Sequence, residues 1–306
     1  MDKICKEYLN NHDVDAIGVG IIDFDSKDFI SKTYQKHDGV IVDNSKIYFD
    51  LASLTKVLTN GFFYLDHIKQ MDSKDRLLIE HRAGLPAWGL LSKNSWRDEI
   101  FSYPISESQT LYSDYSALRF MLEVEKKLGC NFKEEVSKFY DCELKFWKEL
   151  DILDETLQNG YEKGLPNFSK VHDPNARNIN EFTSHAGLFA TVDGLCKTLL
   201  KAEDELNFIN TLQANITDNR FVLGWDRVEN PQKSTAGVGC SDSTFGHLGF
   251  TGTSVWIDPR LRKCILILSN TTKHFWHDRY DLNNFRKKLG EIAWTQKKLS
   301  LDSYFY

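Results

Sequence analysis

A serine–lysine pair at the start of a strongly amphipathic segment is the best candidate in this sequence for nucleophilic catalysis. Ser53 is followed three positions later by Lys56, and apolar residues then recur at helical spacing as far as Ile68. This pattern predicts one helix over residues 53–68, with both side chains on one face. The N-terminus of a helix carries partial positive charge and free N–H groups. It would stabilise an alkoxide on Ser53, and the Ser53 N–H would bind an oxyanion.

Lys56 is the expected proton carrier, because burial beside these positive dipoles predicts a lowered pKa for its ammonium group. The spacing alone is weak evidence, since a match occurs about once by chance in a chain of this length. The alternative is a serine that caps a helix, followed by a solvated lysine.

Two later segments carry further candidate groups. Tyr112 precedes a predicted helix, and a phenol near a lysine ammonium is expected to have a lowered pKa. Residues 246–253 combine three glycines with a β-prone run and contain His247. Glycines allow a backbone to approach a ligand closely at a strand edge. Taken singly, the segments also fit a tyrosine that anchors a helix and a hairpin with a surface histidine.

In this order, the three motifs resemble those of the serine beta-lactamase and DD-peptidase superfamily, on its class C beta-lactamase and S12-type peptidase branch. The motifs are Ser53–Lys56, Tyr112-Ser113-Asp114 and His247-Leu248-Gly249. Three more stretches are similar to the family: residues 78–86, 171–176 and 185–189. The resemblance covers roughly residues 15–290.

The resemblance implies roles for particular residues. Tyr112 would be the base that activates the serine or the deacylating water, and the N–H of Phe250 would be the second oxyanion donor. Asp114, His247 and Gly249 would contact the substrate. Asp114 stands where the family usually has asparagine, and His247 where it more often has lysine. Both departures leave recognition of the substrate open.

The order of predicted strands and helices indicates an α+β fold, that is, an α/β arrangement of two lobes. Both lobes would belong to a single catalytic domain over residues 1–306. Strands are expected at 16–23, 29–35, 221–228, 251–258 and 264–269, and residues 41–51 are expected to be a loop. The last two strands flank the turn Asp258-Pro259-Arg260 and are expected to form a hairpin. Helices are expected at 118–128, closed by Gly129, and at 281–297. One antiparallel sheet built from both termini would form a lobe over about 1–56 and 215–306. A mainly helical lobe over about 57–214 would be inserted between them.

Composition excludes several classes of function. The net charge is −6 without a basic cluster, so no nucleic-acid partner is expected. The first residues contain no apolar run, which predicts a cytoplasmic protein without a membrane span. The six cysteines are scattered, so neither disulfides nor zinc are expected. No cofactor or metal is predicted, and His172, Asp173 and His185 are expected to brace a long loop by hydrogen bonds.

The sequence therefore favours a serine hydrolase that forms an acyl-enzyme on Ser53 and acts on a small molecule or short peptide. A DD-carboxypeptidase, a beta-lactamase and an esterase all remain open, as does the oligomeric state. The alternative is a catalytically silent relative that binds a peptide or a partner protein in the same cleft. Asp114 and His247 are the features that favour this alternative.

Overall fold

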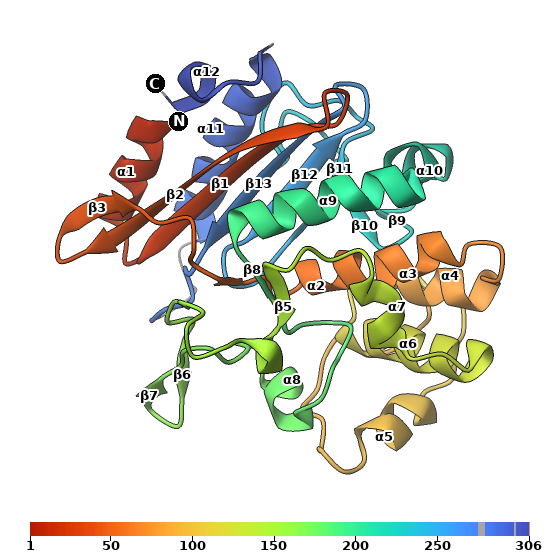
Figure 1. The fold of residues 1–306 in the computed structure, drawn as a ribbon. Helices are drawn as coiled ribbons and strands as arrows, with labels where there is room; N and C mark the ends of the chain where they lie inside the picture. The colour runs from red at the N-terminus through yellow and green to blue at the C-terminus, as the bar shows by residue number, and fades with distance from the viewer. Residues whose placement is uncertain (275–278, 297, 306) are drawn as a thin grey trace.

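One antiparallel sheet of eight strands is built from the two ends of the chain (Figure 1). The computed structural model describes residues 1–274, 279–296 and 298–305. The strand order is β3-β2-β1-β13-β12-β11-β10-β9, which confirms the predicted α+β fold with a sheet from both termini. The strands are β1 (Ala16–Asp23), β2 (Asp28–His37), β3 (Val40–Asp43), β9 (Phe221–Val222), β10 (Trp225–Arg227), β11 (Phe245–Leu248), β12 (Ser254–Asp258) and β13 (Lys263–Ser269).

Strand β1 lies at the centre and is covered on both faces. Its odd-numbered residues Ile17, Val19 and Ile21 pack toward the terminal helices α1 (Asp2–Asn11) and α11 (Arg279–Thr295). The opposite face carries Gly18 and Gly20, under helix α9 (Val192–Leu206). A Cβ at Gly18 would lie 2.3 Å from a methyl group of Val192, and one at Gly20 would lie 2.7 Å from the Cys196 sulfur. The two glycines therefore let α9 lie directly on the sheet.

The middle of the chain is mainly helical and lies along one edge of this sheet (Figure 1). Two small sheets, β4-β8-β5 and β6-β7, lie among the helices. The α-helices of this stretch, besides α9, are α2 (Leu54–Lys56), α3 (Phe62–Asp66), α4 (Ser73–Ile79), α5 (Trp96–Ser102), α6 (Asp114–Leu128), α7 (Phe132–Ser137), α8 (Pro174–Ile179) and α10 (Phe208–Ala214). The π-helical η1 (Val57–Gly61) and the 3₁₀ turn η2 (Trp147–Glu149) belong to the same stretch, and α12 (Leu301–Phe305) lies near the C-terminus. The short strands are β4 (Phe49–Asp50), β5 (Leu144–Phe146), β6 (Tyr161–Glu162), β7 (Leu165–Pro166) and β8 (Leu188–Ala190).

Most expected elements are present with shifted ends. The hairpin around residues 258–260 is confirmed, because β12 and β13 pair from Ser254↔Ile267 to Asp258↔Lys263. Helix α6 ends at Gly129, which has φ +65°, as expected of a glycine C-cap. It begins at Asp114, four residues before the predicted start, because Ser113 caps it by accepting from the Ser116 N–H at 2.9 Å.

The helix predicted over 53–68 is present from Leu54 to Asp66, and its middle, η1, is π-helical. Within η1 the Thr59 hydroxyl lies 2.7 Å from the carbonyl oxygens of both Thr55 and Ser184. Two expectations about elements were wrong. The strand predicted over 221–228 turns back at Leu223 and Gly224, which have φ +45° and +92°. The loop predicted over 41–51 contains the end of β3 and all of β4.

Helix α11 begins at Arg279 rather than residue 281, and Lys297, its predicted last residue, lies outside the described residues. All six cysteines are free thiols, as expected. Among the helices in the described ranges, none combines the length and the apolar character needed to cross a membrane.

Candidate active site

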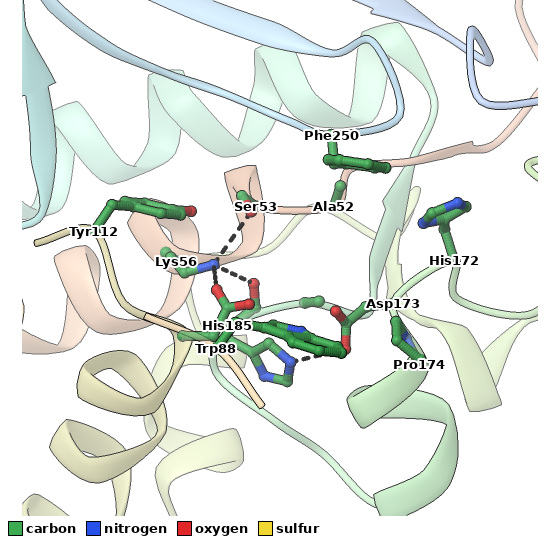
Figure 2. Close-up of a pocket in the computed structure, with 12 residues that line it drawn as sticks. Ala52, Ser53, Lys56, Trp88, Tyr112, His172, Asp173, Pro174, His185 and Phe250 are labelled. Atoms are coloured by element: carbon green, nitrogen blue, oxygen red, sulfur yellow. Dashed lines mark hydrogen bonds and ion pairs between the residues drawn. The ribbon is translucent and has the colours of Figure 1, made fainter. Parts of the chain in front are cut away.

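Ser53 stands at a sharp corner between strand β4 and helix α2. The preceding residue, Ala52, has φ +47°, a conformation that non-glycine residues rarely adopt. The Asp50 carboxylate holds this corner by accepting from the Ala52 N–H at 2.9 Å. Because the chain turns here, Ser53 begins α2 with its side chain facing a cavity (Figure 2).

Asp50 is a buried hub that joins three separate parts of the chain. Its second carboxylate oxygen accepts from the Asn159 side chain at 2.8 Å and from the His172 N–H at 2.6 Å. Burial raises the pKa of Asp50 to about 6, even though these N–H donors favour the ionised form. The carboxylate therefore fixes the corner before Ser53 to the loop that carries His172.

The loop between β11 and β12 is attached to the same corner. The Thr251 hydroxyl donates to the Asp50 carbonyl at 2.6 Å, and the Thr253 hydroxyl donates to the Leu51 carbonyl at 3.1 Å. Gly249 is needed for this approach, because a Cβ there would lie 2.7 Å from the Leu51 carbonyl oxygen. The attachment places Phe250 beside Ser53 (Figure 2).

Lys56 is buried under the serine and has three hydrogen-bonding partners. Its Nζ donates to Ser53 Oγ at 3.2 Å and to the His185 carbonyl at 3.0 Å, and it pairs with Asp114 Oδ1 at 2.7 Å. Burial disfavours the ammonium form, but the Asp114 carboxylate outweighs it and raises the pKa of Lys56. The predicted lowering of this pKa was therefore wrong, because the pairing with Asp114 outweighs the effect of burial.

Tyr112 is positioned by a buried histidine from the loop after α4. The Ser113 N–H donates to His81 Nδ1 at 3.1 Å, and the His81 ring lies 4.8 Å from the Tyr112 ring. The Ser113 hydroxyl donates to the Pro86 carbonyl at 2.5 Å, and the Asp114 N–H donates to the Ala87 carbonyl at 2.9 Å. The stretch at residues 78–86 thus supports the segment that presents Tyr112.

The Tyr112 phenol lies close to Lys56, whose Nζ is 5.0 Å from the ring centre. Burial raises the pKa of Tyr112, and the Lys56 ammonium only partly opposes this effect. The expected lowering of this pKa was wrong, because burial of the phenol outweighs the effect of the nearby ammonium. In the resting site, Lys56 is an ammonium and Tyr112 a neutral phenol.

These groups surround a cavity of about 370 Å³ (Figure 2). Five predicted site residues line it: Ser53, Lys56, Tyr112, Asp114 and Phe250. The rest of the wall is formed by Ala52, Trp88, His172, Asp173, Pro174, His185 and Ala186. Phe250 and Trp88 lie on opposite sides of Ser53 in Figure 2 and make much of the surface apolar.

His247 and Gly249 are not brought to the wall of this cavity. His247 is buried on β11 behind Tyr112, with 5.7 Å between ring centres, and its Nδ1–H donates to the Leu248 carbonyl at 2.9 Å. Burial lowers the pKa of His247 to about 4. Among the described residues His247 Nε2 has no hydrogen-bond partner, and the predicted contact between His247 and the substrate stays a prediction. Gly249 packs against the Ser53 corner instead.

The sequence reasoning gave no site role to the residues on the far side of the cavity. His172 and Asp173 belong to the stretch at 171–176, and His185 to the stretch at 185–189, so the family-like stretches were the signal that marked them. His185 Nε2 lies 2.9 Å from Asp173 Oδ1, which confirms the expected bracing of the loop. No feature of the sequence indicated that Asp50 would hold the corner before Ser53.

Two clusters in the described part of the chain have donor atoms close enough for a cation. Asp114, Asp173 and His185 offer one atom each within 4.8 Å of one another in the cavity. Asp66, His67 and Glu135 do so at the surface, where Lys138 already pairs with both carboxylates. The prediction of a site without metal stays a prediction.

Comparison with known proteins gives consistent matches. The Beta-lactamase family matches residues 76–285, a stretch that includes Tyr112 and His247 and begins after Lys56. The chain is 31% identical to a putative D-alanyl-D-alanine carboxypeptidase of Salmonella enteritidis, over 75% of this chain and 68% of that protein. It is 24% identical to an N-acetylmuramyl-L-alanine amidase of Bacillus subtilis, over 75% and 67%. The structure of a class C beta-lactamase mutant superposes with a TM-score of 0.68, at 11% identity, over 94% and 95% of the chains.

Proposed function

This protein belongs to the beta-lactamase family, and we propose that it is a serine hydrolase that forms an acyl-enzyme on Ser53. One observation carries the proposal: the Lys56 ammonium lies 3.2 Å from Ser53 Oγ, buried beneath a cavity large enough for a small acyl group. A lysine that merely follows a helix cap would extend into solvent. Burial of this charge against a serine is typical of an activated nucleophile.

In the proposed reaction, Ser53 Oγ attacks the carbonyl carbon of an amide or ester. The serine proton passes to Tyr112, and the N–H groups of Ser53 and Phe250 bind the oxyanion. The tetrahedral intermediate then expels the amine or alcohol, which takes the proton from Tyr112. Water then attacks the acyl carbon and gives a proton to Tyr112. The carboxylic acid leaves, and Ser53 Oγ takes the proton back from Tyr112.

The resting site has one proton too many for this step. Lys56 is held as an ammonium by Asp114, and burial keeps Tyr112 neutral. Neither group can accept the serine proton until the pair has lost one proton of its own. The proposed active form is therefore a minority species at neutral pH, and its population grows as the pH rises.

The proposed substrate class is supported by the activities of the two relatives. A carboxypeptidase and an amidase both transfer an acyl group from an amide nitrogen to water, and the proposed mechanism performs this transfer on an amide or an ester. Weak acylation by penicillin is expected for the same reason.

The alternative, a catalytically silent binding protein, is favoured by one observation. The ion pair between Lys56 and Asp114, 2.7 Å long, keeps Lys56 protonated, so that it cannot accept the serine proton. If that pair never opens, Ser53 would be a polar group in a binding cleft with no chemistry of its own.

Intact-mass spectrometry after incubation with a fluorophosphonate separates the two functions. We expect a stoichiometric mass gain that disappears in Ser53→Ala and remains in Ser26→Ala, which changes an exposed serine in the turn between β1 and β2. Parallel incubation with a fluorescent penicillin tests acylation by a strained amide. An unlabelled wild-type protein, or equal labelling of Ser53→Ala, would overturn the assignment.

A further inference from the structure

The cavity wall carries a second carboxylate beside the one that pairs with Lys56. Lys56 and Asp114 neutralise each other across 2.7 Å, which leaves the Asp173 carboxylate. Burial disfavours ionisation of Asp173, but its hydrogen bonds and the neighbouring His185 outweigh burial and lower its pKa to about 2. Burial also lowers the pKa of His172 to about 4, so His172 is uncharged at neutral pH. Asp173 is therefore the charge that faces a bound molecule.

Asp173 uses only one of its two oxygens to hold the fold. Oδ1 accepts from the Ala176 N–H at 2.7 Å, which caps helix α8, and from His185 Nε2 at 2.9 Å. Within the described ranges Oδ2 has no hydrogen-bond partner, and Figure 2 shows the carboxylate turned into the cavity, on the side away from Tyr112.

The spacing of these groups fits a small cation. One oxygen of Asp114, one of Asp173 and a nitrogen of His185 lie within 4.8 Å of one another. A primary ammonium donates in tetrahedral directions over about 2.8–2.9 Å, so a single nitrogen can bridge the two carboxylates. We propose that this cavity selects acyl donors that carry a primary ammonium group, held by Asp173 and Asp114. The inference rests on the proposed function, because it names the acyl substrate of the same serine.

The apolar walls restrict the rest of the donor. Trp88 and Phe250 are 52% and 37% exposed and lie on opposite sides of the cavity (Figure 2). Their ring faces cover apolar substituents, and an aromatic face near an ammonium adds a favourable interaction. The chemical class that matches both features is an aminoacyl amide or ester with an apolar side chain.

Two substrates that differ only in the ammonium group test this inference. They are the 7-amino-4-methylcoumarin amides of phenylalanine, in both enantiomers, and of 3-phenylpropanoic acid. We expect kcat/KM to favour one phenylalanine amide by about tenfold or more, as for a charge-assisted hydrogen bond in a partly buried site. In Asp173→Asn, which keeps an oxygen for Ala176 and His185, this ratio should fall about tenfold. Asp72→Asn makes the same change at the cap of α4 and should preserve the ratio.

Binding is measured separately, so that failure of the proposed chemistry does not hide the answer. Phenethylamine should raise the melting temperature of Ser53→Ala more than 2-phenylethanol does, and adding Asp173→Asn should remove the difference. Equal effects of the two ligands, or a ratio of one for the two amides, would overturn the inference. So would a requirement for a divalent cation that EDTA reveals, because the carboxylates would then be metal ligands.

Discussion

Replacing Asp114 by asparagine should move the pH dependence of the serine reaction without moving the residues around it. Asparagine has the shape of aspartate and keeps one oxygen toward the Lys56 ammonium. The backbone N–H of residue 114 still donates to the Ala87 carbonyl, so helix α6 starts in the same place. The substitution therefore removes the negative charge that holds Lys56 protonated.

The expected size of the shift follows from the geometry of the pair. The two charged atoms are 2.7 Å apart, and the side chains of Lys56 and Asp114 are 4% and 16% exposed. Charge-assisted hydrogen bonds in such settings contribute about 1.5–3 kcal/mol. Since one pKa unit corresponds to about 1.4 kcal/mol, the pKa of Lys56 should fall by about 1–2 units in Asp114→Asn.

The assay is the second-order rate of fluorophosphonate labelling of Ser53 as a function of pH. The reactive form has lost one proton from the Lys56–Tyr112 pair, so the wild-type rate should rise with pH. In Asp114→Asn the rise should begin about 1–2 pH units lower, which makes the variant about tenfold faster or more at neutral pH. Asp66→Asn is the matched control, because Asp66 pairs with Lys138 at the same distance of 2.7 Å away from the cavity.

A profile for Asp114→Asn that coincides with the wild type would refute this reasoning, because the proton that limits the reaction would then not be bound to the Lys56–Tyr112 pair. A shift toward higher pH would mean that the carboxylate itself takes part as a base.

Three further substitutions test the groups that hold the site. Asp50→Asn keeps one acceptor oxygen where the carboxylate offers two, so an N–H of Ala52, Asn159 or His172 loses its acceptor. Stability should fall by about 1–3 kcal/mol, seen as a lower melting temperature. Because the pKa of Asp50 is about 6 rather than the usual 3.8, wild-type stability should fall as the pH rises from about 4 to 6, and this component should vanish in the variant. His81→Gly keeps the positive φ of 56° but removes the acceptor of the Ser113 N–H, so the labelling rate should drop while far-UV circular dichroism is unchanged. Tyr112→Phe should keep the fold and slow labelling by about 100-fold or more, and a rate near wild type would assign the base elsewhere.

Local sequence was sufficient wherever neighbours along the chain set the structure. Strand β1, the turn at 258–260 and the Gly129 cap were predicted because each depends on positions within a few residues. The same holds for Ser53 and Lys56, since a separation of three on a helix brings the side chains together. The fold class followed from where strands and helices lie along the chain.

Only the tertiary structure decided the ionisation of the site and the shape of its far wall. Lys56 meets the carbonyl of His185, 129 residues away, and Asp50 meets His172, 122 residues away. The pKa of a lysine or tyrosine depends on burial and on charges within a few ångströms, which spacing in the sequence does not give. The sequence by itself thus determined which groups could react, and the packing of distant loops determined which of them are charged and what the cavity presents to a substrate.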